Sequence, residues 1–136
     1  MTDTDQGRRT PLHYAALAND TGTVRQLLAQ GASPSAADRQ GFTPLHFAAQ
    51  QQSLPAAELL LTAGAQVDAP NQYGNTPLAV AVMNSRGHGD LIQLLRRHGA
   101  DPHHHNNAGQ TPVGTAQLIA NYNIAQYFTD LPSQSA

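Results

Sequence analysis

Histidine and aspartate are the residues of this sequence best suited to chemistry, because both can transfer protons and bind metal ions. The chain has no cysteine, which excludes a thiolate nucleophile, a disulfide framework and a cysteine-ligated metal. The candidates are His13, His46, the consecutive His103, His104 and His105, and the carboxylates of Asp38, Asp68, Asp90 and Asp101.

The run His103-His104-His105 has the composition of a metal site but not its spacing. Consecutive residues of an extended chain point in alternating directions, so one ion would rarely meet all three rings. Further ligands are also scarce, since cysteine is absent and few carboxylates lie nearby. We predict an exposed turn and no physiological metal here, although the sequence leaves metal binding by these histidines open.

The remaining candidates do not form a catalytic pattern. A hydrolase needs a nucleophile with an oriented base, or paired carboxylates in a cleft. The aspartates lie at expected turns and helix starts, where capping explains them. Gly87-His88-Gly89 lacks the strand, spacing and lysine of a phosphate-binding loop. We therefore predict no enzymatic activity and no cofactor.

The dominant feature of the sequence is an internal repeat. The heptapeptide Thr-Pro-Leu-His-Tyr-Ala-Ala at residues 10–16 returns at 43–49 with Phe47 in place of Tyr14, and in more altered form at 76–82 and 111–117. The first two steps are 33 residues and the third is 35. A Leu-Leu-x-x-Gly-Ala element follows at residues 27–32, 60–65 and, altered, 95–100, and each heptapeptide is preceded by Asp5, Asp38, Asn71 or Asn106.

Each recurring residue has a structural purpose. The threonine can cap a helix through its hydroxyl, and proline suits the first helical turn, where its missing N–H costs nothing. The alanine pair keeps one helix face shallow, so that a neighbouring helix can approach closely. Gly31, Gly64 and Gly99 can end a second helix in the left-handed conformation. The Asp or Asn and a later glycine favour a tight turn before the next threonine.

This pattern strongly resembles the ankyrin repeat, over roughly residues 5–131. The resemblance implies an all-α solenoid of four helix-turn-helix repeats with projecting β-turn loops, forming a single domain over residues 1–136. The repeats fall at approximately 5–37, 38–70, 71–105 and 106–131. It also implies that His13 and His46 are structural residues that hydrogen-bond to neighbouring backbone, and not a catalytic pair.

Two departures from the repeat are expected to matter. The third repeat has two extra residues within 85–90, which we expect to form an exposed, mobile loop, either a tolerated insertion or a partner contact. The last repeat is unusually apolar for a terminal unit. It either caps itself with its aromatic residues or exposes a patch for dimerisation or a partner. We expect a monomer, with a homodimer through this repeat as the alternative. Its apolar residues are Leu118, Ile119, Tyr122, Ile124, Ala125, Tyr127, Phe128 and Leu131.

Ankyrin repeats usually bind partners through a concave face formed by the turns and the first helices. Carried over position by position, the resemblance predicts a binding surface with Phe42 and Tyr73 as anchors, since interface hot spots favour aromatic residues and arginine. The alternative for either aromatic is a ring lying over its neighbouring turn. The predicted partner-binding residues are Arg9, Arg39, Gln40, Phe42, Gln50, Gln72, Tyr73, Asn75, Met83, His105 and Asn107, with Gln6, Leu17, Gln51, Asn84, Gln110 and Leu118 beside them.

Composition limits the kind of partner and the compartment. The net charge is −2, with seven basic residues, all of them arginine, scattered along the chain apart from the pairs Arg8-Arg9 and Arg96-Arg97. We interpret these pairs as a solvated chain end and a helix C-terminus. Nucleic-acid binding needs a concentrated basic face, so no nucleic-acid partner is expected. No apolar run approaches the length of a membrane span. The polar, acidic N-terminus does not resemble a secretory signal, which predicts a cytoplasmic protein unless a signal has been cleaved from a precursor.

The resulting hypothesis is a non-catalytic module that binds another protein. Small ankyrin proteins of this type resemble bacterial ones, some of which are immunity proteins that neutralise a toxin, and the absence of lysine suits a GC-rich genome. The partner would then be a toxin or effector. The alternatives are an adaptor or chaperone-like protein, a self-associating structural protein and, least favoured, an enzyme or metal-binding protein.

Overall fold

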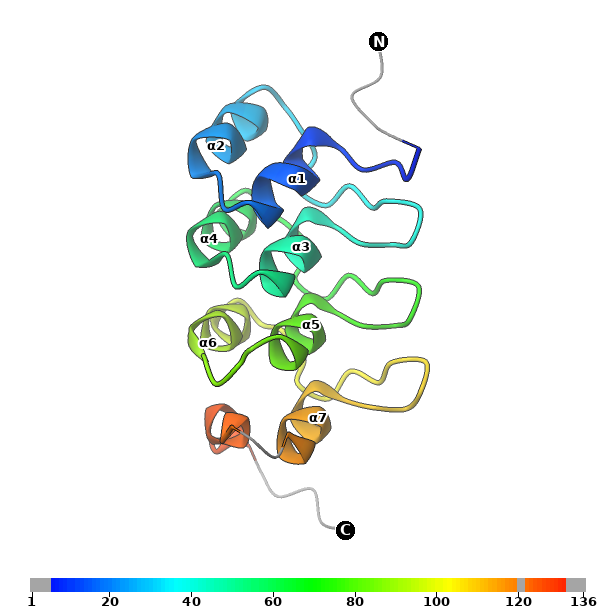
Figure 1. Cartoon of the computed structure of the whole chain (residues 1–136), viewed down its shortest axis with the longest axis vertical. Coiled ribbons are helices and arrows are strands. Elements are labelled where there is room, and N and C mark those ends of the chain that lie inside the picture. Colours follow the sequence, from blue (N-terminus) through cyan, green and yellow to red (C-terminus); the bar gives the residue numbers. More distant parts are fainter. Residues whose placement is uncertain (1–5, 120–121, 132–136) are drawn as a thin grey trace.

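The computed structural model describes residues 6–119 and 122–131, and within these ranges the chain is helical and contains no strand (Figure 1). The predicted turn residue Asp5 lies outside the described residues. The elements are α1 (Pro11–Leu17), α2 (Thr21–Ala29), α3 (Pro44–Gln50), α4 (Leu54–Thr62), α5 (Pro77–Met83), α6 (Asp90–Arg97), α7 (Pro112–Leu118) and the 3-10 helix η1 (Ile124–Phe128).

The repeated threonine and proline start every second helix, as the sequence predicts. The side chains of Thr10, Thr43, Thr76 and Thr111 each accept a hydrogen bond from the backbone N–H three residues later. A proline follows each threonine in the first helical turn. This side-chain bond satisfies a backbone donor that has no partner within the helix, and it fixes where the helix begins.

The helices stack in two columns. The inner helices α1, α3, α5 and α7 pack on one another in sequence order, and the outer helices α2, α4 and α6 form the second column. Figure 1 shows the connecting turns projecting on the side of the inner helices away from the outer ones. Gly31, Gly64 and Gly99 follow the three outer helices with φ of 92°, 95° and 89°, which confirms their predicted left-handed conformation.

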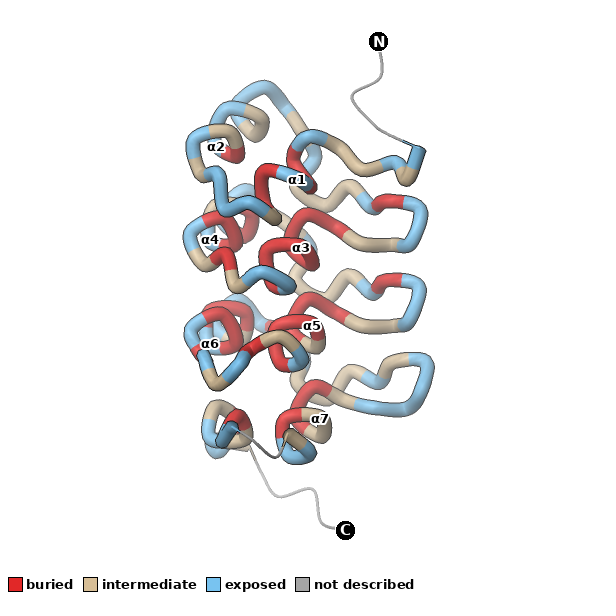
Figure 2. Tube along the Cα trace, viewed as in Figure 1, coloured by how far each residue is buried: buried red, intermediate tan, exposed pale blue. Residues whose placement is uncertain are grey.

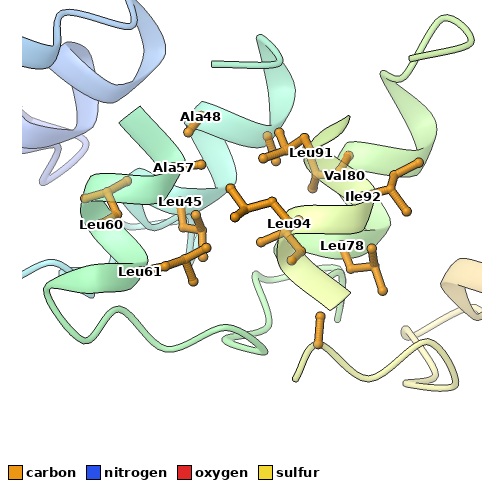
Figure 3. Close-up of a cluster of buried hydrophobic side chains, with 14 of the residues drawn as sticks. Leu45, Ala48, Ala57, Leu60, Leu61, Leu78, Val80, Leu91, Ile92 and Leu94 are labelled. Carbon is orange, nitrogen blue, oxygen red and sulfur yellow. The ribbon is translucent and has the colours of Figure 1, made fainter. Parts of the chain in front are cut away.

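The core runs continuously between the two columns. Figure 3 shows Leu45, Leu60 and Leu61 of the second repeat and Leu78 and Leu94 of the third within one cluster of buried side chains. Alanines at the helix contacts, such as Ala48, are fully buried and keep the spacing narrow. One repeat could not bury its own apolar stripe, so each unit depends on its neighbours for stability.

The insertion in the third repeat differs from the expected exposed, mobile loop. Ser85 and Gly89 are buried, while Arg86 and His88 between them are exposed. The hydroxyl of Tyr127 donates to the Gly87 carbonyl (3.4 Å), and the Tyr127 ring lies directly against Gly89. The two extra residues extend the chain far enough to meet the terminal repeat, so the insertion packs against the end of the stack.

The terminal repeat contains elements of both predicted arrangements. Ile124 and Phe128 are buried and close the end of the core, which is self-capping. Leu118 and Tyr122 nevertheless remain exposed, Leu118 to 76%. The second helix of this repeat is the five-residue 3-10 helix η1 and not an α-helix. Helices gain most of their stability from packing, and among the described residues no further repeat packs on η1.

Arg96 of α6 fastens η1 to the rest of the stack. Its guanidinium forms two bonds to the Asp130 carboxylate (2.6 and 2.8 Å) and donates to the Tyr127 carbonyl (2.8 Å). It also lies over the Phe128 ring, 5.3 Å from the centroid. The bidentate geometry suits arginine specifically. The sequence indicates only a cation at a helix C-terminus, because the partner of Arg96 lies 34 residues later in the chain.

We expect Gly89→Ala to destabilise the protein, because a Cβ at this position would overlap the Tyr127 ring. Overpacking of this kind costs about 1–3 kcal/mol. Thermal unfolding measures the effect, and in a Tyr127→Ala background the same change should cost much less. Gly22→Ala is the matched control, since its Cβ would meet only Asp20 at 3.9 Å. An unchanged melting temperature for Gly89→Ala would contradict the packing of the insertion on η1.

Candidate protein-binding surface

The second, third and fourth projecting turns are each closed by the side-chain oxygen of an Asp or Asn. In the second turn, Oδ1 of Asp38 accepts from the backbone N–H groups of Gln40 (2.9 Å) and Phe42 (2.8 Å). Asn71 and Asn106 make the corresponding pairs of bonds in the third and fourth turns. These bonds hold the tips in one conformation, so that their side chains are presented by a preorganised backbone.

Backbone hydrogen bonds join successive turns into a ladder. The N–H of Arg39 donates to the Gly7 carbonyl (2.7 Å), that of Gln72 to Gln40 (2.8 Å), and that of Asn107 to Tyr73 (2.9 Å). The tips of all four repeats are therefore neighbours, although they are more than thirty residues apart in sequence. The turns form one surface and not four separate loops.

The close approach of the turns requires glycine. A Cβ on Gly41 would lie 2.9 Å from the Cα of Asn71, and one on Gly74 would lie 2.8 Å from the backbone nitrogen of Asn107. Both glycines also have positive φ, 80° and 76°. Arg8, the residue at this position in the first turn, adopts a φ of 61° and so carries a side chain in the left-handed region.

His13 and His46 connect each inner helix to the following turn. Nδ1 of His13 accepts from the Thr10 backbone N–H (2.9 Å), and Nε2 donates to the Phe42 carbonyl (2.8 Å). His46 repeats the arrangement with Thr43 (3.0 Å) and with the Asn75 carbonyl (2.9 Å). A backbone N–H can only donate and a carbonyl only accept, so both rings are neutral with the proton on Nε2. The predicted structural role of these histidines is confirmed.

Burial makes the charged form of both rings unfavourable. Desolvation lowers the pKa of His46 from 6.5 to about 4, against the opposing effects of its bond to Asn75 and of the Asp38 carboxylate. The pKa of His13 is also lowered, again mainly by burial. A proton on Nδ1 would in addition meet the N–H of the capping threonine, so the neutral state belongs to the folded stack.

Asparagine side chains join the third and fourth turns, where no histidine connects an inner helix to the following turn. The third and fourth repeats have Ala79 and Gly114 at this position. Between their turns, Nδ2 of Asn106 donates to Oδ1 of Asn75 (2.9 Å), and Nδ2 of Asn107 donates to the Gln72 carbonyl (2.8 Å). Side-chain amides therefore supplement the backbone ladder between the third and fourth turns, where no histidine does so.

The predicted binding residues lie on the turns and on the C-terminal ends of the inner helices. Figure 2 shows that the tips of the turns are exposed. We define the docking surface as the turns at residues 6–9, 38–42, 71–75 and 105–110 together with the exposed residues of the inner helices. Arg39, Gln40, Gln50, Gln72, Tyr73, Met83, His105 and Asn107 are exposed, and Arg9, Phe42 and Asn75 are half-buried.

Phe42 differs from Tyr73, although the sequence treats them as equivalent anchors. The Phe42 ring stacks on Phe47 (centroids 5.7 Å apart) and meets the edge of His46 (5.5 Å). The Phe42 ring is therefore packed against α3 of its own repeat. Tyr73 has no such neighbour among the ring contacts and is 54% exposed. Of the two, Tyr73 has the accessibility of an anchor.

Tyr14 is a surface aromatic that the sequence analysis missed. It occupies the same repeat position as the buried Phe47 and Val80 but is exposed on α1, because no earlier repeat among the described residues covers it. It lies beside Arg9, whose pKa is raised first by a hydrogen bond to Tyr14 and then by Asp38. Arg9 also lies 5.6 Å from the centre of the Phe47 ring. The sequence does contain an indication of this exposure, because position 14 has a tyrosine, whose hydroxyl suits contact with solvent, where the later repeats have Phe47 and Val80.

The histidines and aspartates that suggest catalysis or metal binding are not arranged as such a site among the described residues. His13, His46 and Asp38 are engaged in backbone hydrogen bonds. His103, His104 and His105 lie on the chain leading into the fourth turn, where His105 is exposed. Within the described residues, no group of three or more His, Asp or Glu side chains is placed to hold a metal ion. No helix in the same ranges is long and apolar enough to cross a membrane.

Comparison with protein families agrees with this geometry. A family model of three ankyrin repeats matches residues 1–71, and a model of a single ankyrin repeat matches residues 73–107. The chain therefore belongs to the ankyrin-repeat family. A search of curated proteins found no match. Ankyrin repeats are generally protein–protein interaction modules without catalytic activity, and protein partners are what this family implies.

The buried histidines predict that acid destabilises the stack before most carboxylates titrate. The pKa of His46 is about 4 in the folded protein and 6.5 in the unfolded chain. Between these two pH values the unfolded chain therefore binds a proton at His46 that the folded protein does not bind. Stability is then highest above pH 6.5 and falls as the pH drops toward about 4. The full loss for His46 is about 3 kcal/mol. Urea unfolding from pH 7 to about pH 5 measures the slope.

His46→Ala provides the check on this assignment. The variant should lose about 2 kcal/mol at pH 7, because the Thr43 N–H and the Asn75 carbonyl lose their buried partner. It should also show a weaker dependence on pH than the wild type. His88→Ala removes an exposed histidine instead and should leave the slope unchanged. An equal slope in His46→Ala and the wild type would contradict the role of this ring.

Proposed function

We propose that this protein acts by binding another protein through the docking surface, without catalysing a reaction. The observation that carries the proposal is the ladder of turns, in which Arg39, Gln72 and Asn107 donate backbone bonds to the turn before them. The ladder offers side chains of four repeats on one preorganised backbone. Binding to such a surface requires little ordering of the chain, which lowers the entropic cost of association.

The chemistry of the exposed side chains supports protein recognition. Tyr73 and Met83 are 54% and 49% exposed and are surrounded by amide side chains such as Gln72 and Asn84. A few large apolar anchors within a polar surround are typical of protein interfaces. A hollow beside the inner helices, lined by Gln50, Gln51, Gln52, Asn84, Ser85, Arg86 and His88, extends the surface toward the insertion.

The finer role that we favour is that of an immunity protein or inhibitor, which neutralises a toxin or enzyme by occupying it. In this role the docking surface would cover the part of the partner that it binds and so block or sequester it. An adaptor or chaperone-like role is the second candidate, since the same surface could bridge two proteins. We expect a monomer in the cytoplasm, with pairing through the exposed Leu118 and Tyr122 as the alternative to be tested by light scattering.

Tyr73→Ala should weaken binding to the natural partner while changing the free energy of unfolding by less than about 0.5 kcal/mol. Phe42→Ala should weaken binding and also lower stability by about 1–2 kcal/mol, because it removes the stacking on Phe47. Quantitative affinity capture from the source cell, paired with urea unfolding, measures both effects. Gln26→Ala on the outer helix α2 is the control. If Tyr73→Ala recovers the same partner in full, the assignment of the docking surface is wrong.

Co-expression separates the two finer roles. If the protein is an immunity protein, it should protect cells from a toxic product encoded beside its own gene, and Tyr73→Ala should reduce this protection. Gln26→Ala should protect as well as the wild type. If the protein protects against none of the products encoded beside its gene, the immunity role is excluded and the adaptor role is favoured. That result would leave the docking surface untested, because the capture experiment tests it separately.

A further inference from the structure

The charges of the docking surface are unevenly distributed. Its first two turns contain Arg8, Arg9 and Arg39, and the only carboxylate on its described residues is that of Asp38. The Asp38 side chain is 1% exposed and faces its own turn, where it accepts two backbone bonds and pairs with Arg9 (3.4 Å). Among the described residues, the accessible charge on this part of the surface is therefore positive, although the whole chain has a net charge of −2.

The other described carboxylates lie away from the docking surface. They occur at the start of outer helices, on outer helices, in the connections that follow them, or after η1. These residues are Asp20, Asp90, Glu58, Asp68, Asp101 and Asp130. A partner that approaches the turns thus meets arginine and neutral side chains.

The third and fourth turns are closed without a negative charge. Asn71 and Asn106 occupy the position of Asp38 and make the same two backbone bonds, at 2.9 to 3.1 Å. A neutral amide oxygen is thus sufficient to close a turn of this shape. The choice of asparagine leaves the C-terminal half of the docking surface without a carboxylate among the described residues.

Arg8 and Arg39 are brought together by the turn ladder. The backbone bond from Arg39 to Gly7 (2.7 Å) places Arg39 next to the residue that precedes Arg8. Both side chains are exposed, and neither forms an ion pair with a carboxylate of the described residues. Arg9 differs, because Asp38 and the Phe47 ring already hold it. Two accessible guanidinium groups therefore stand on adjacent tips.

The opposite half of the docking surface carries no arginine and no carboxylate among its described residues. Tyr73, Met83 and Leu118 are 54%, 49% and 76% exposed there, and the neighbouring tip residues Gln72 and Asn107 are neutral amides. The arginines of the docking surface thus lie in its first two repeats, together with the exposed Tyr14, whereas its last two repeats present Tyr73, Met83 and Leu118.

We propose that the partner presents an acidic protein surface, whose carboxylates face Arg8 and Arg39 and whose apolar residues face Tyr73 and Met83. This inference rests on the proposed function and adds the chemistry and the orientation of the partner. Carboxylates match the planar guanidinium fork in geometry and charge. Complementary charge of this kind accelerates association and fixes orientation more than it adds affinity.

Selection from a random peptide display library tests the proposal without knowledge of the natural partner. Peptides selected on the wild type should be enriched in Asp and Glu toward one end and in aromatic or aliphatic residues toward the other. Their binding should depend on Tyr73 and weaken with added salt, because exposed charges are screened. Arg8→Gln/Arg39→Gln should lower their affinity about tenfold. Arg25→Gln/Arg97→Gln, which removes two exposed arginines from outer helices, should leave it unchanged.

The outcomes distinguish the inference from the proposed function. Peptides that require Tyr73 but are not acidic, or that bind Arg8→Gln/Arg39→Gln at full strength, would overturn the acidic partner and leave the docking surface intact. If no selected peptide depends on Tyr73 or Met83, both proposals fail. Labelled DNA and RNA oligonucleotides serve as a further arm. Binding of either that requires Arg8 and Arg39 would assign these residues to phosphate and would also overturn the inference.

Discussion

The rest of the structure depends on the hydrogen bonds that join one repeat to the next. The imidazoles of His13 and His46 link an inner helix to the following turn, and the backbone ladder links turn to turn. Apolar burial favours stacking but is non-directional and does not fix the orientation of the tips. The directional bonds do, and they turn four weakly stable units into one surface with a defined arrangement of side chains.

This constraint explains the structural use of His13, His46 and Asp38. A buried imidazole that donates to a carbonyl and accepts from a capping threonine has no lone pair or proton left for a substrate. Asp38 is likewise committed to its turn. The scaffold thus uses the reactive residue types internally, and the side chains left for recognition are those for which it has no structural need, such as Tyr73, Met83 and Arg39.

The local structure could be predicted from the sequence, whereas the contacts between distant segments could not. The threonine caps and the helix-ending glycines follow from local rules, because each involves a residue type with one preferred conformation or partner. The backbone role of His13 is implied by the resemblance to ankyrin repeats. The packing of Tyr127 on Gly89, the pairing of Arg96 with Asp130 and the stacking of Phe42 on Phe47 depend on three-dimensional neighbours. The 3-10 form of η1 could likewise not be predicted from its composition.

Hydrogen–deuterium exchange of the protein, free and bound to its natural partner, tests the central claim most directly. The account predicts that binding slows exchange at the amides of the second and third turns, residues 38–42 and 71–75, and at the ends of α3 and α5. The outer helices α2 and α4 should exchange at the same rate in both states. Protection centred on the outer helices, with no change at the turns, would contradict the assignment of the docking surface.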